Sequence, residues 1–536
     1  MRSALPRSSA SRSSAFSTPD KPNLPFPQCF RETRTLRRAD TSPWGKPSAT
    51  LPNSSRVCRK HSLFKPFAFM KLSTYFTLLA SLLIHFPAFG KNGGPNFIII
   101  IGDDVGWDAF GCTGMKQART PAIDQLASES SMMTRFYCSV SQCAPLRAEL
   151  YTGLLPKKNG VLANAVKEKR TGVRNVADHL IPLGYEVGLT GKRHFGLGSA
   201  KIDVIPGFSP NGNGSNQVHS FDGVENYVSQ AKQKGNSFCV IIAATHAHHP
   251  WDHGKESNFP AGNIRVRPHY LDTPTARQAM AKHAAEVEVL DRQVRETREL
   301  MKRMDLEKDT ILIFLSEQGI AMPRGKWSPY EHGSRALCLA YWKGRILSRK
   351  TTALAMYCDV VPTLVDFAGG KDPGLDGKSL KELWTSKQVK SHRDEVLISN
   401  IHPFWQKAIV TDTYKLIWTG HPERNHVFSN FTSRNKFFSK PWAEWMDEAK
   451  TNETAARKVE RILQPKPFEL YDVVSDPYEI NDLSSLPEHQ KRIASLQAKL
   501  KKLMTDCGES TTPPGPEESK KKKNKANRRK PRRPSK

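Results

Sequence analysis

Acidic, cationic and imidazole side chains follow four short apolar runs of the sequence. Each run is typical of a strand that is buried on both faces of a sheet. The runs are residues 96–101, 186–190, 238–244 and 310–316. Because the carboxyl ends of parallel strands meet at one edge of a sheet, we expect the side chains that follow them to form one site. These side chains are Asp103, Asp104, Lys192, His194, His246, His248, His249, Glu317 and Gln318.

A fifth segment adds a thiol and a guanidinium group. Pro145 fits the first turn of a helix, which places Cys143 at or near the helix N-cap. Free N–H groups and the helix dipole favour a negatively charged group there. Arg147 lies one helical turn further along, on the same face. This spacing alone also fits a buried structural cysteine, but the convergence of five segments favours a catalytic site.

The elements that must position these groups alternate along the chain. Helical stretches separate the apolar runs, and the clearest is residues 275–304, which are charged and amphipathic. Alternating strands and helices indicate an α/β fold with a mostly parallel sheet that helices cover on both faces.

The motif Cys143-x-Pro145-x-Arg147 resembles the signature of the formylglycine-dependent (type I) sulfatases. The resemblance covers about residues 95–485. It implies an alkaline-phosphatase-like fold, with a large, mixed, mostly parallel sheet flanked by helices and a smaller C-terminal α+β domain with an antiparallel sheet. Residues 468–479 are similar to the closing segment of that second domain. The resemblance further implies that a maturation enzyme oxidises Cys143 to Cα-formylglycine, whose hydrate is the nucleophile.

The same resemblance implies a divalent metal ion. Asp103 and Asp104 match the two N-terminal ligands of the family's metal, and Cys143 as formylglycine is the third. Glu317 and Gln318 stand where most members have Asp-Asn or Asp-His. Each side chain is one methylene longer but retains an oxygen ligand, so Ca²⁺ is the expected ion. The Glu-Gln pair resembles a bacterial heparan-N-sulfatase-like subgroup.

Catalytic roles also follow from the resemblance. Arg147 is expected to hold the formylglycine hydrate, while Lys192 and Lys326 bind the sulfate. We expect both lysines to face sulfate oxygens rather than protein carboxylates. His248 would donate a proton to the leaving alcohol or amine, and His194 would take one from the second hydroxyl of the hydrate. An alanine replaces the first proline of the family's Pro-His-x-Pro motif next to His248.

These residues predict a hydrolase that removes sulfate from a sulfated glycan or a small sulfate ester. The sequence leaves open whether the bond is O–S or N–S. The alternative within the superfamily is a phosphonate or phosphate monoester hydrolase. A third alternative is a non-catalytic polyanion-binding protein that acts through the basic ends of the chain.

The net charge of +29 is uneven along the 536 residues. Residues 1–69 carry a net charge of +10 and residues 520–536 carry +11, which leaves +8 for the rest. Total charge is therefore no argument for nucleic-acid binding by the globular part.

A signal-like segment at residues 70–90 predicts export. Residues 70–90 have a short basic start, an apolar stretch and a small-x-small site, as in a secretory signal peptide. Residues 1–69 are interpreted as a disordered extension or a wrongly assigned start. We expect a periplasmic or secreted protein with a catalytic domain, a smaller domain and a disordered basic tail, which either is solvated or contacts polyanions. Their expected ranges are 91–385, 386–507 and 508–536.

Overall fold

The computed structural model describes residues 93–168, 170–194, 201–207, 220–432 and 439–515. The expected signal peptide, the extension before it and most of the expected basic tail lie outside these residues. Among the described residues, no helix combines the length and the apolar character that crossing a bilayer requires.

The main sheet confirms the four strands expected from the apolar runs. β1 (Asn96–Ile101) pairs in parallel with β7 (Ser237–Ala243) on one side and with β8 (Thr310–Leu315) on the other. β5 (Tyr185–Gly191) pairs in parallel with β7. The full order is β10-β2-β9-β8-β1-β7-β5-β6, with β11 also paired to β2. The other strands are β2 (Ser131–Tyr137), β6 (Asp203–Val204), β9 (Arg335–Tyr341), β10 (Arg349–Thr351) and β11 (Ala355–Met356). β9 runs antiparallel to β2 and β8, so the sheet is mixed, as expected.

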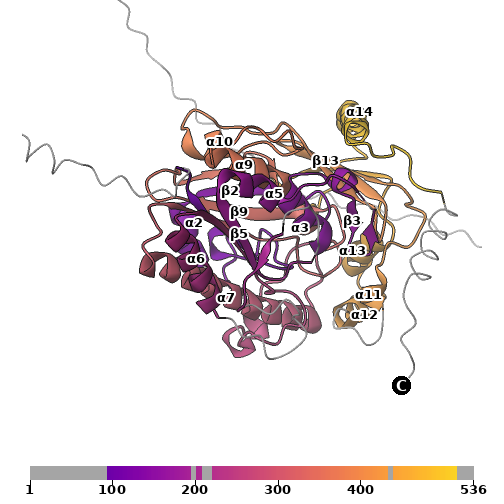
Figure 1. Ribbon diagram of the computed structural model, residues 1–536. Coiled ribbons are helices and arrows are strands. Elements are labelled where there is room, and N and C mark those ends of the chain that lie inside the picture. The colour runs from indigo at the N-terminus through magenta and orange to yellow at the C-terminus, as the bar shows by residue number, and fades with distance from the viewer. Residues whose placement is uncertain (1–92, 169, 195–200, 208–219, 433–438, 516–536) are drawn as a thin grey trace, which may run out of the picture. The chain divides into compact units, whose positions relative to one another are not determined.

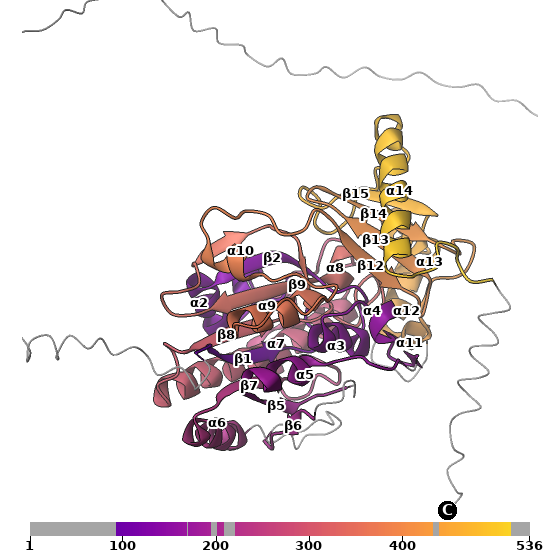
Figure 2. The ribbon, with the colours of Figure 1, turned by 45° about the horizontal axis from the view of Figure 1, so that its top comes forward.

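Helices cover both faces of this sheet (Figures 1 and 2). The side chains of β1 alternate between two apolar clusters: Phe97, Ile99 and Ile101 belong to one, and Ile98 and Ile100 to the other. The first cluster contains residues of α3 (Cys143–Thr152), α5 (Val176–Leu180), α9 (Val360–Phe367) and α10 (Lys381–Thr385). The second contains residues of α2 (Pro121–Glu129), α6 (Asp222–Lys234) and α7 (Pro274–Arg303). The ends of α7 differ from the expected helix by one residue.

A second, antiparallel sheet follows in the chain, as expected. Its strands β12 (Val396–Asn400), β13 (Gln406–Val410), β14 (Tyr414–Thr419) and β15 (Phe468–Asp472) pair in this order. One face packs on Tyr137, Leu155 and Tyr330 of the large domain. The other face packs on α14 (Gln490–Asp506), which Figure 2 shows in yellow beside the sheet. The division between residues 385 and 386 stays a prediction.

Three helices between β14 and β15 join a further apolar cluster with the first turns of α7. They are α11 (Ser429–Thr432), α12 (Ser439–Glu448) and α13 (Glu453–Leu463). The remaining short elements connect the main ones. They are α4 (Pro156–Asn159), α8 (Glu331–Ser334), β3 (Val161–Ala163), β4 (Val166–Lys167), η1 (Gly111–Thr113), η2 (Ile181–Leu183), η3 (Glu256–Asn258), η4 (Ala261–Asn263), η5 (Tyr357–Asp359) and η6 (Pro487–His489).

The start of the expected disordered tail contacts the second sheet instead. The carboxylate of Glu509 accepts hydrogen bonds from Ser399 Oγ at 2.6 Å and from Lys407 Nζ at 2.5 Å. His421 Nε2 donates to the carbonyl oxygen of Pro514 at 2.9 Å. Because Lys407 is buried, its ammonium group needs an anionic partner, which the sequence composition of residues 508–515 did not indicate.

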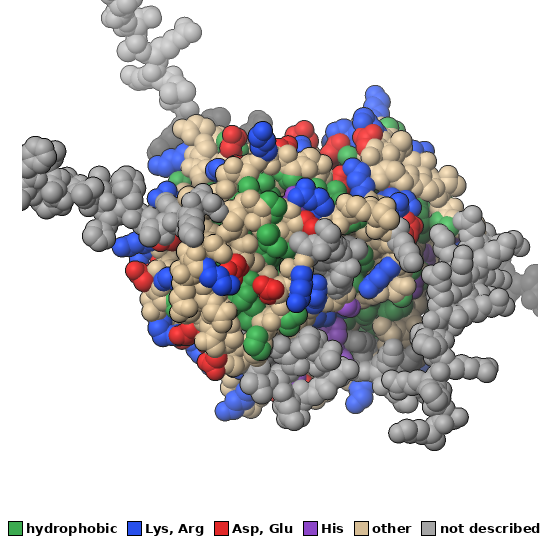
Figure 3. Space-filling view, viewed as in Figure 1, with side chains coloured by type: hydrophobic (Ala, Val, Ile, Leu, Met, Phe, Trp, Pro, Cys, Tyr) green, Lys and Arg blue, Asp and Glu red, His purple; other side chains and the backbone are tan. Residues whose placement is uncertain are grey.

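Charged side chains are interspersed over the face of the protein seen in Figure 3. Lys and Arg lie beside Asp and Glu there, which agrees with the modest net charge of the middle of the chain.

Candidate active site

The segments predicted to form one site do meet at the carboxyl end of the central strands. Cys143 Sγ lies 3.6 Å from Asp103 Oδ1 and 3.5 Å from Asp104 Oδ1. Gln318 Nε2 lies 3.2 Å from the same sulfur, and Lys326 Nζ lies 3.1 Å from it. These five residues are all buried. Side chains that follow separate strands thus lie together as expected, and their catalytic roles stay predictions.

Cys143 is the first residue of α3, and Gln142 is the N-cap. The Gln142 side chain holds this start in place, because its Oε1 accepts from Asn164 N at 3.0 Å and its Nε2 donates to His402 O at 2.6 Å. Pro145 lies in the first turn, where its missing N–H group leaves no helical hydrogen bond unmade. Burial and the nearby Glu317 carboxylate raise the pKa of the Cys143 thiol far above its ordinary value. The unmodified thiol is therefore protonated and a poor nucleophile.

Arg147 ties together the ends of three strands. Its Nε donates to Glu317 Oε1 at 2.9 Å, its Nη1 to the backbone oxygen of Lys192 at 2.9 Å, and its Nη2 to that of Gly102 at 3.2 Å. The guanidinium group is completely buried. Arg147 thus fixes the segments after β8, β5 and β1 relative to α3, in addition to any role in holding a nucleophile.

The two lysines contact protein carboxylates, which differs from the expectation that they face only sulfate oxygens. Lys192 Nζ is ion-paired with Asp103, and Lys326 Nζ lies 2.6 and 2.8 Å from the two oxygens of Asp104. Buried carboxylates require nearby positive charge, and the lysines supply it. Although burial opposes ionisation, Lys192 lowers the pKa of Asp103 and Lys326 lowers the pKa of Asp104. Lys326 contacts Cys143 and Lys192 interacts with it electrostatically, so a substrate anion at Cys143 would compete for both lysines.

The donor atoms at this edge fit a hard divalent cation. The buried Gln318 Oε1 has no hydrogen-bond partner among the described residues, while its Nε2 points at Asp104 Oδ1 at 2.6 Å. Ligand atoms of Asp103, Asp104, Cys143 and His248 lie within 4.8 Å of one another. Carboxylate and amide oxygens suit Ca²⁺ or Mg²⁺. The residues therefore fit the expected metal, and its identity stays a prediction.

Both carboxylate oxygens of Glu317 already accept hydrogen bonds from neighbouring protein groups. Its Oε1 accepts from Arg147, while its Oε2 accepts from Asp104 N at 2.9 Å and from Gln318 Nε2 at 2.8 Å. Burial and the Asp103 carboxylate raise the pKa of Glu317 to about 8. In this arrangement Glu317 holds Asp104 and Arg147 in position, and its role as a ligand stays a prediction.

The two histidines that are expected to transfer protons differ in their contacts with the cluster. His248 Nε2 is 3.6 Å from Asp104 Oδ2, and its Nδ1 contacts the backbone oxygen of His249 at 2.5 Å. His194 is exposed, has a left-handed φ of 60°, and makes no hydrogen bond to the cluster among the described residues. Sequence reasoning placed both histidines at the cluster, and the structure brings only His248 into contact with it.

One residue at the site was missed from the sequence. His283 lies on α7, and its Nε2 contacts the backbone oxygen of Asp104 at 3.0 Å. This contact supports Asp104, which has a left-handed φ of 53°. A histidine on the apolar face of an amphipathic helix was the available signal, but nothing in its spacing pointed to Asp104.

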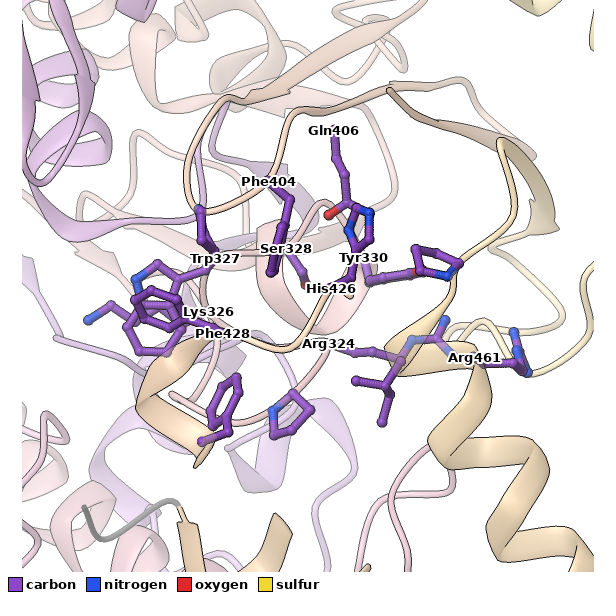
Figure 4. Close-up of a pocket in the computed structure, with 15 residues that line it drawn as sticks. Arg324, Lys326, Trp327, Ser328, Tyr330, Phe404, Gln406, His426, Phe428 and Arg461 are labelled. Carbon is purple, nitrogen blue, oxygen red and sulfur yellow. The ribbon is translucent and has the colours of Figure 1, made fainter. Parts of the chain in front are cut away.

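A small pocket adjoins Lys326 on the side of the second domain. Figure 4 shows Trp327 and Phe428 side by side at one end of it and Arg461 at the other. The ring centroids of Trp327 and Phe428 are 4.7 Å apart, and those of Phe404 and His426 are 4.5 Å apart. The large domain and the second domain both contribute to its lining.

The family model for sulfatases matches residues 95–370. This chain belongs to the sulfatase family. An ulvan-active sulfatase from Formosa agariphila is 28% identical over 416 residues, which are 74% of this chain and 77% of that protein. Human arylsulfatase A is 28% identical over 352 residues, covering 54% of this chain and 67% of that enzyme. The protein is therefore an enzyme of the sulfatase class, as the motifs predicted.

Solved structures agree on the fold. A protein solved in complex with its substrate D-glucosamine-2-N,6-O-disulfate matches with a TM-score of 0.60 and 17% identity, over 78% of this sulfatase and 98% of that chain. The phosphonate monoester hydrolase of Agrobacterium radiobacter matches with a TM-score of 0.58 and 15% identity, over 77% of this chain and 96% of that chain. The expected alkaline-phosphatase-like architecture with its smaller antiparallel domain is confirmed.

Proposed function

We propose that this sulfatase removes sulfate from a sulfated glycan and that Cys143, converted to formylglycine, is its nucleophile. The observation that carries the proposal is the Cys143 thiol itself. It is buried at the first residue of α3, within 3.6 Å of two aspartates and 3.1 Å from a lysine. A glycan substrate is supported by the similarity to an ulvan-active sulfatase and to N-acetylgalactosamine-6-sulfatase of the rat, which is 25% identical over 347 residues.

The protonated thiol explains why the residue has to be modified. Formylglycine as its hydrate supplies two hydroxyl groups, one to attack the sulfur of the ester and one whose deprotonation expels sulfate. Lys326 stabilises negative charge on an oxygen at the position of Cys143 Sγ, and Arg147 holds the start of α3 and the neighbouring strand ends in register.

Two histidines carry the protons in this proposal. His248 protonates the leaving oxygen or nitrogen as its bond to sulfur breaks, because its Nε2 faces the cluster while its Nδ1 is engaged by a backbone oxygen. Burial lowers the pKa of His248, and a bound sulfate anion would raise its proton affinity again. His194, which interacts electrostatically with Lys192 and Asp103, takes the proton from the second hydroxyl.

A divalent cation, Ca²⁺ by its oxygen ligands, completes the proposal. Asp103, Asp104, Gln318 and the oxygen that replaces Cys143 Sγ would hold it. When bound, the ion stabilises negative charge that develops on the sulfate group. Asp104→Asn should lose most bound Ca²⁺ and nearly all turnover, measured by metal analysis and sulfate release. Retention of both would contradict the assignment of Asp104.

The substrate class is tested by sulfate release from a panel of substrates. Ulvan, glycosaminoglycans with O- and N-sulfate groups and a small aryl sulfate are incubated with matured enzyme and with Cys143→Ala as the matched control. Release from at least one polysaccharide, abolished in the control, is the expected result. An aryl phosphonate is added because a phosphonate hydrolase shares the fold. A faster reaction with the phosphonate than with every sulfate ester would favour that alternative.

We also propose that the protein is exported after cleavage near Lys91, which rests on the signal-like residues 70–90. N-terminal sequencing of secreted protein should find a first residue close to Lys91. A mature chain that retains residues 1–69 would contradict both the cleavage and the late start.

A further inference from the structure

A second group of metal-binding side chains lies beside the segment that carries His248. One ligand atom each from His246, His253 and Glu286 lies within 4.8 Å of the others. None of these residues belongs to the Asp103–Asp104 cluster, and the mechanism proposed above does not use their side chains. His246 and His253 lie in the segment that follows β7, and Glu286 lies on α7.

The three side chains are already in contact. His246 Nδ1 lies 2.5 Å from Glu286 Oε2, and His253 Nδ1 lies 3.9 Å from the same oxygen. The two imidazole rings are 5.1 Å apart and nearly perpendicular. Asp252 lies at the solvent side of the cluster, where its Oδ1 is 2.8 Å from His253 Nδ1. Two imidazoles and one carboxylate therefore lie within 4.8 Å of one another, and Asp252 contacts the outer imidazole.

The backbone orients the Glu286 carboxylate toward the two imidazoles. Glu286 Oε1 accepts hydrogen bonds from His253 N at 2.6 Å and from Gly254 N at 3.0 Å, which leaves Oε2 directed at the histidines. Support of this kind, in which one carboxylate oxygen is fixed and the other is presented, is typical of metal sites. The side chains of His246 and Glu286 are 2% and 1% exposed. Their environment is thus preorganised and largely closed to solvent.

The donor set distinguishes among metals. Two imidazoles with carboxylate oxygens match Zn²⁺, whereas Ca²⁺ and Mg²⁺ favour oxygen alone. Tetrahedral zinc with ligand bonds of about 2.0–2.1 Å separates its donors by roughly 3.3 Å. This value lies between the two separations of 2.5 Å for His246–Glu286 and 3.9 Å for His253–Glu286. We propose that His246, His253 and Glu286 bind one zinc ion.

A zinc ion at this point would fasten the His248 loop to α7. Gly254 already lies directly on the helix, since a Cβ atom there would be 2.2 Å from the carbonyl carbon of Ala285. The backbone oxygen of His246 accepts from Asp103 N at 2.9 Å, which connects the cluster to the active site. The ion is therefore a positioning element for Asp103 and His248, and it touches no reacting atom.

The test uses the full chain without an affinity tag, stripped with a chelator and then exposed to Zn²⁺ alone. After gel filtration, metal analysis should find about one zinc per chain. Asp104→Asn should retain it. His253→Ala and Glu286→Gln should each weaken binding at least tenfold, as loss of a zinc ligand or its support commonly does. His249→Ala is the matched control, because it removes a histidine of the same loop outside the cluster, and it should bind zinc as the wild type does.

Location is tested independently of how the variants fold. Wild-type crystals soaked in Zn²⁺ and measured on both sides of the zinc absorption edge should show an anomalous peak between His253 and Glu286. Cobalt substitution of the wild type should give the visible absorption of a tetrahedral site. No peak at that place, or equal zinc binding by the wild type and His253→Ala, would overturn the proposal and leave His246–Glu286 as a hydrogen-bonded pair only.

Discussion

Lys326 has two tasks at the scale of a single residue. It neutralises the buried Asp104 carboxylate, and it lies against the atom that we propose as nucleophile. The sequence motif predicted the second task and not the first, because a lysine beside a glycine and a tryptophan does not reveal which carboxylate it meets 222 residues away. Neutralising Asp104 affects the stability of the fold, whereas the contact with the nucleophile affects turnover. The two tasks can therefore be measured separately.

Replacing Lys326 with methionine keeps most of the volume and removes the charge. We expect kcat/KM to fall by ~10²–10³, since one electrostatic contact to the developing charge is lost. Stability should also fall, by up to about 3–5 kcal/mol, because Asp104 is left buried without its partner. Added Ca²⁺ should restore part of the melting temperature if a cation binds at Asp104. Lys326→Arg should recover little activity, since a planar fork replaces a point charge.

Lys381→Met is the control for this variant. Lys381 pairs with Asp366 at the surface, where both side chains are well exposed, so neither activity nor the melting temperature should change much. If Lys326→Met keeps full activity and only melts earlier, Lys326 is a structural ion-pair residue, and other groups bind the sulfate.

At the scale of elements, α3 is held by a carboxyl group at its centre. Glu149 Oε2 accepts from Ser139 N at 3.0 Å and from Ser139 Oγ, and Oε1 faces Cys358 N at 3.3 Å. Burial raises the pKa of Glu149 to about 7 from the ordinary 4.5. The folded protein therefore keeps a proton on Glu149 at pH values where the unfolded chain has released it.

This shift predicts how stability depends on pH. Because the folded pKa is the higher one, stability from Glu149 is fully present below pH 4.5 and is lost as the pH rises to about 7. The difference of about 2.5 pKa units corresponds to ~3 kcal/mol. Glu149→Gln should remove this loss, so urea unfolding at pH 5 and pH 7.5 should show the variant gaining about that much relative to wild type. Glu382→Gln, an exposed change on α10, should show no such gain, and identical pH profiles for Glu149→Gln and wild type would refute the assignment.

The sequence predicted the secondary-structure elements better than it predicted the side-chain contacts between them. The apolar runs fixed the four central strands, and the periodic pattern placed α7 within one residue, because both signals are local. The contacts of His283 with Asp104 and of Glu149 with Cys358 span 179 and 209 residues. Such contacts depend on how elements pack, and no single-sequence pattern carries that information.

At the scale of the whole molecule, the resemblance predicted two sheets and their order, and composition misjudged residues 508–515. The composition of residues 508–515 indicated a polar tail, yet Glu509 contacts the second sheet and Pro514 contacts His421, just after β14. Deleting residues 516–536 should leave activity and melting temperature unchanged. Deleting 508–536 should lower the melting temperature, because Lys407 loses its buried partner. Equal melting of both truncated proteins, measured by calorimetry, would show that the contact of Glu509 contributes nothing.

The proposed reaction requires that Cys143 is converted to formylglycine. The direct measurement is peptide mass spectrometry of protein produced with and without a formylglycine-generating maturation enzyme, with sulfate release assayed on the same samples. We predict a mass loss that corresponds to exchanging one sulfur and two hydrogens for one oxygen on the Cys143 peptide, and activity in proportion to the converted fraction. A fully active preparation in which Cys143 is entirely an unmodified thiol would contradict the proposed nucleophile.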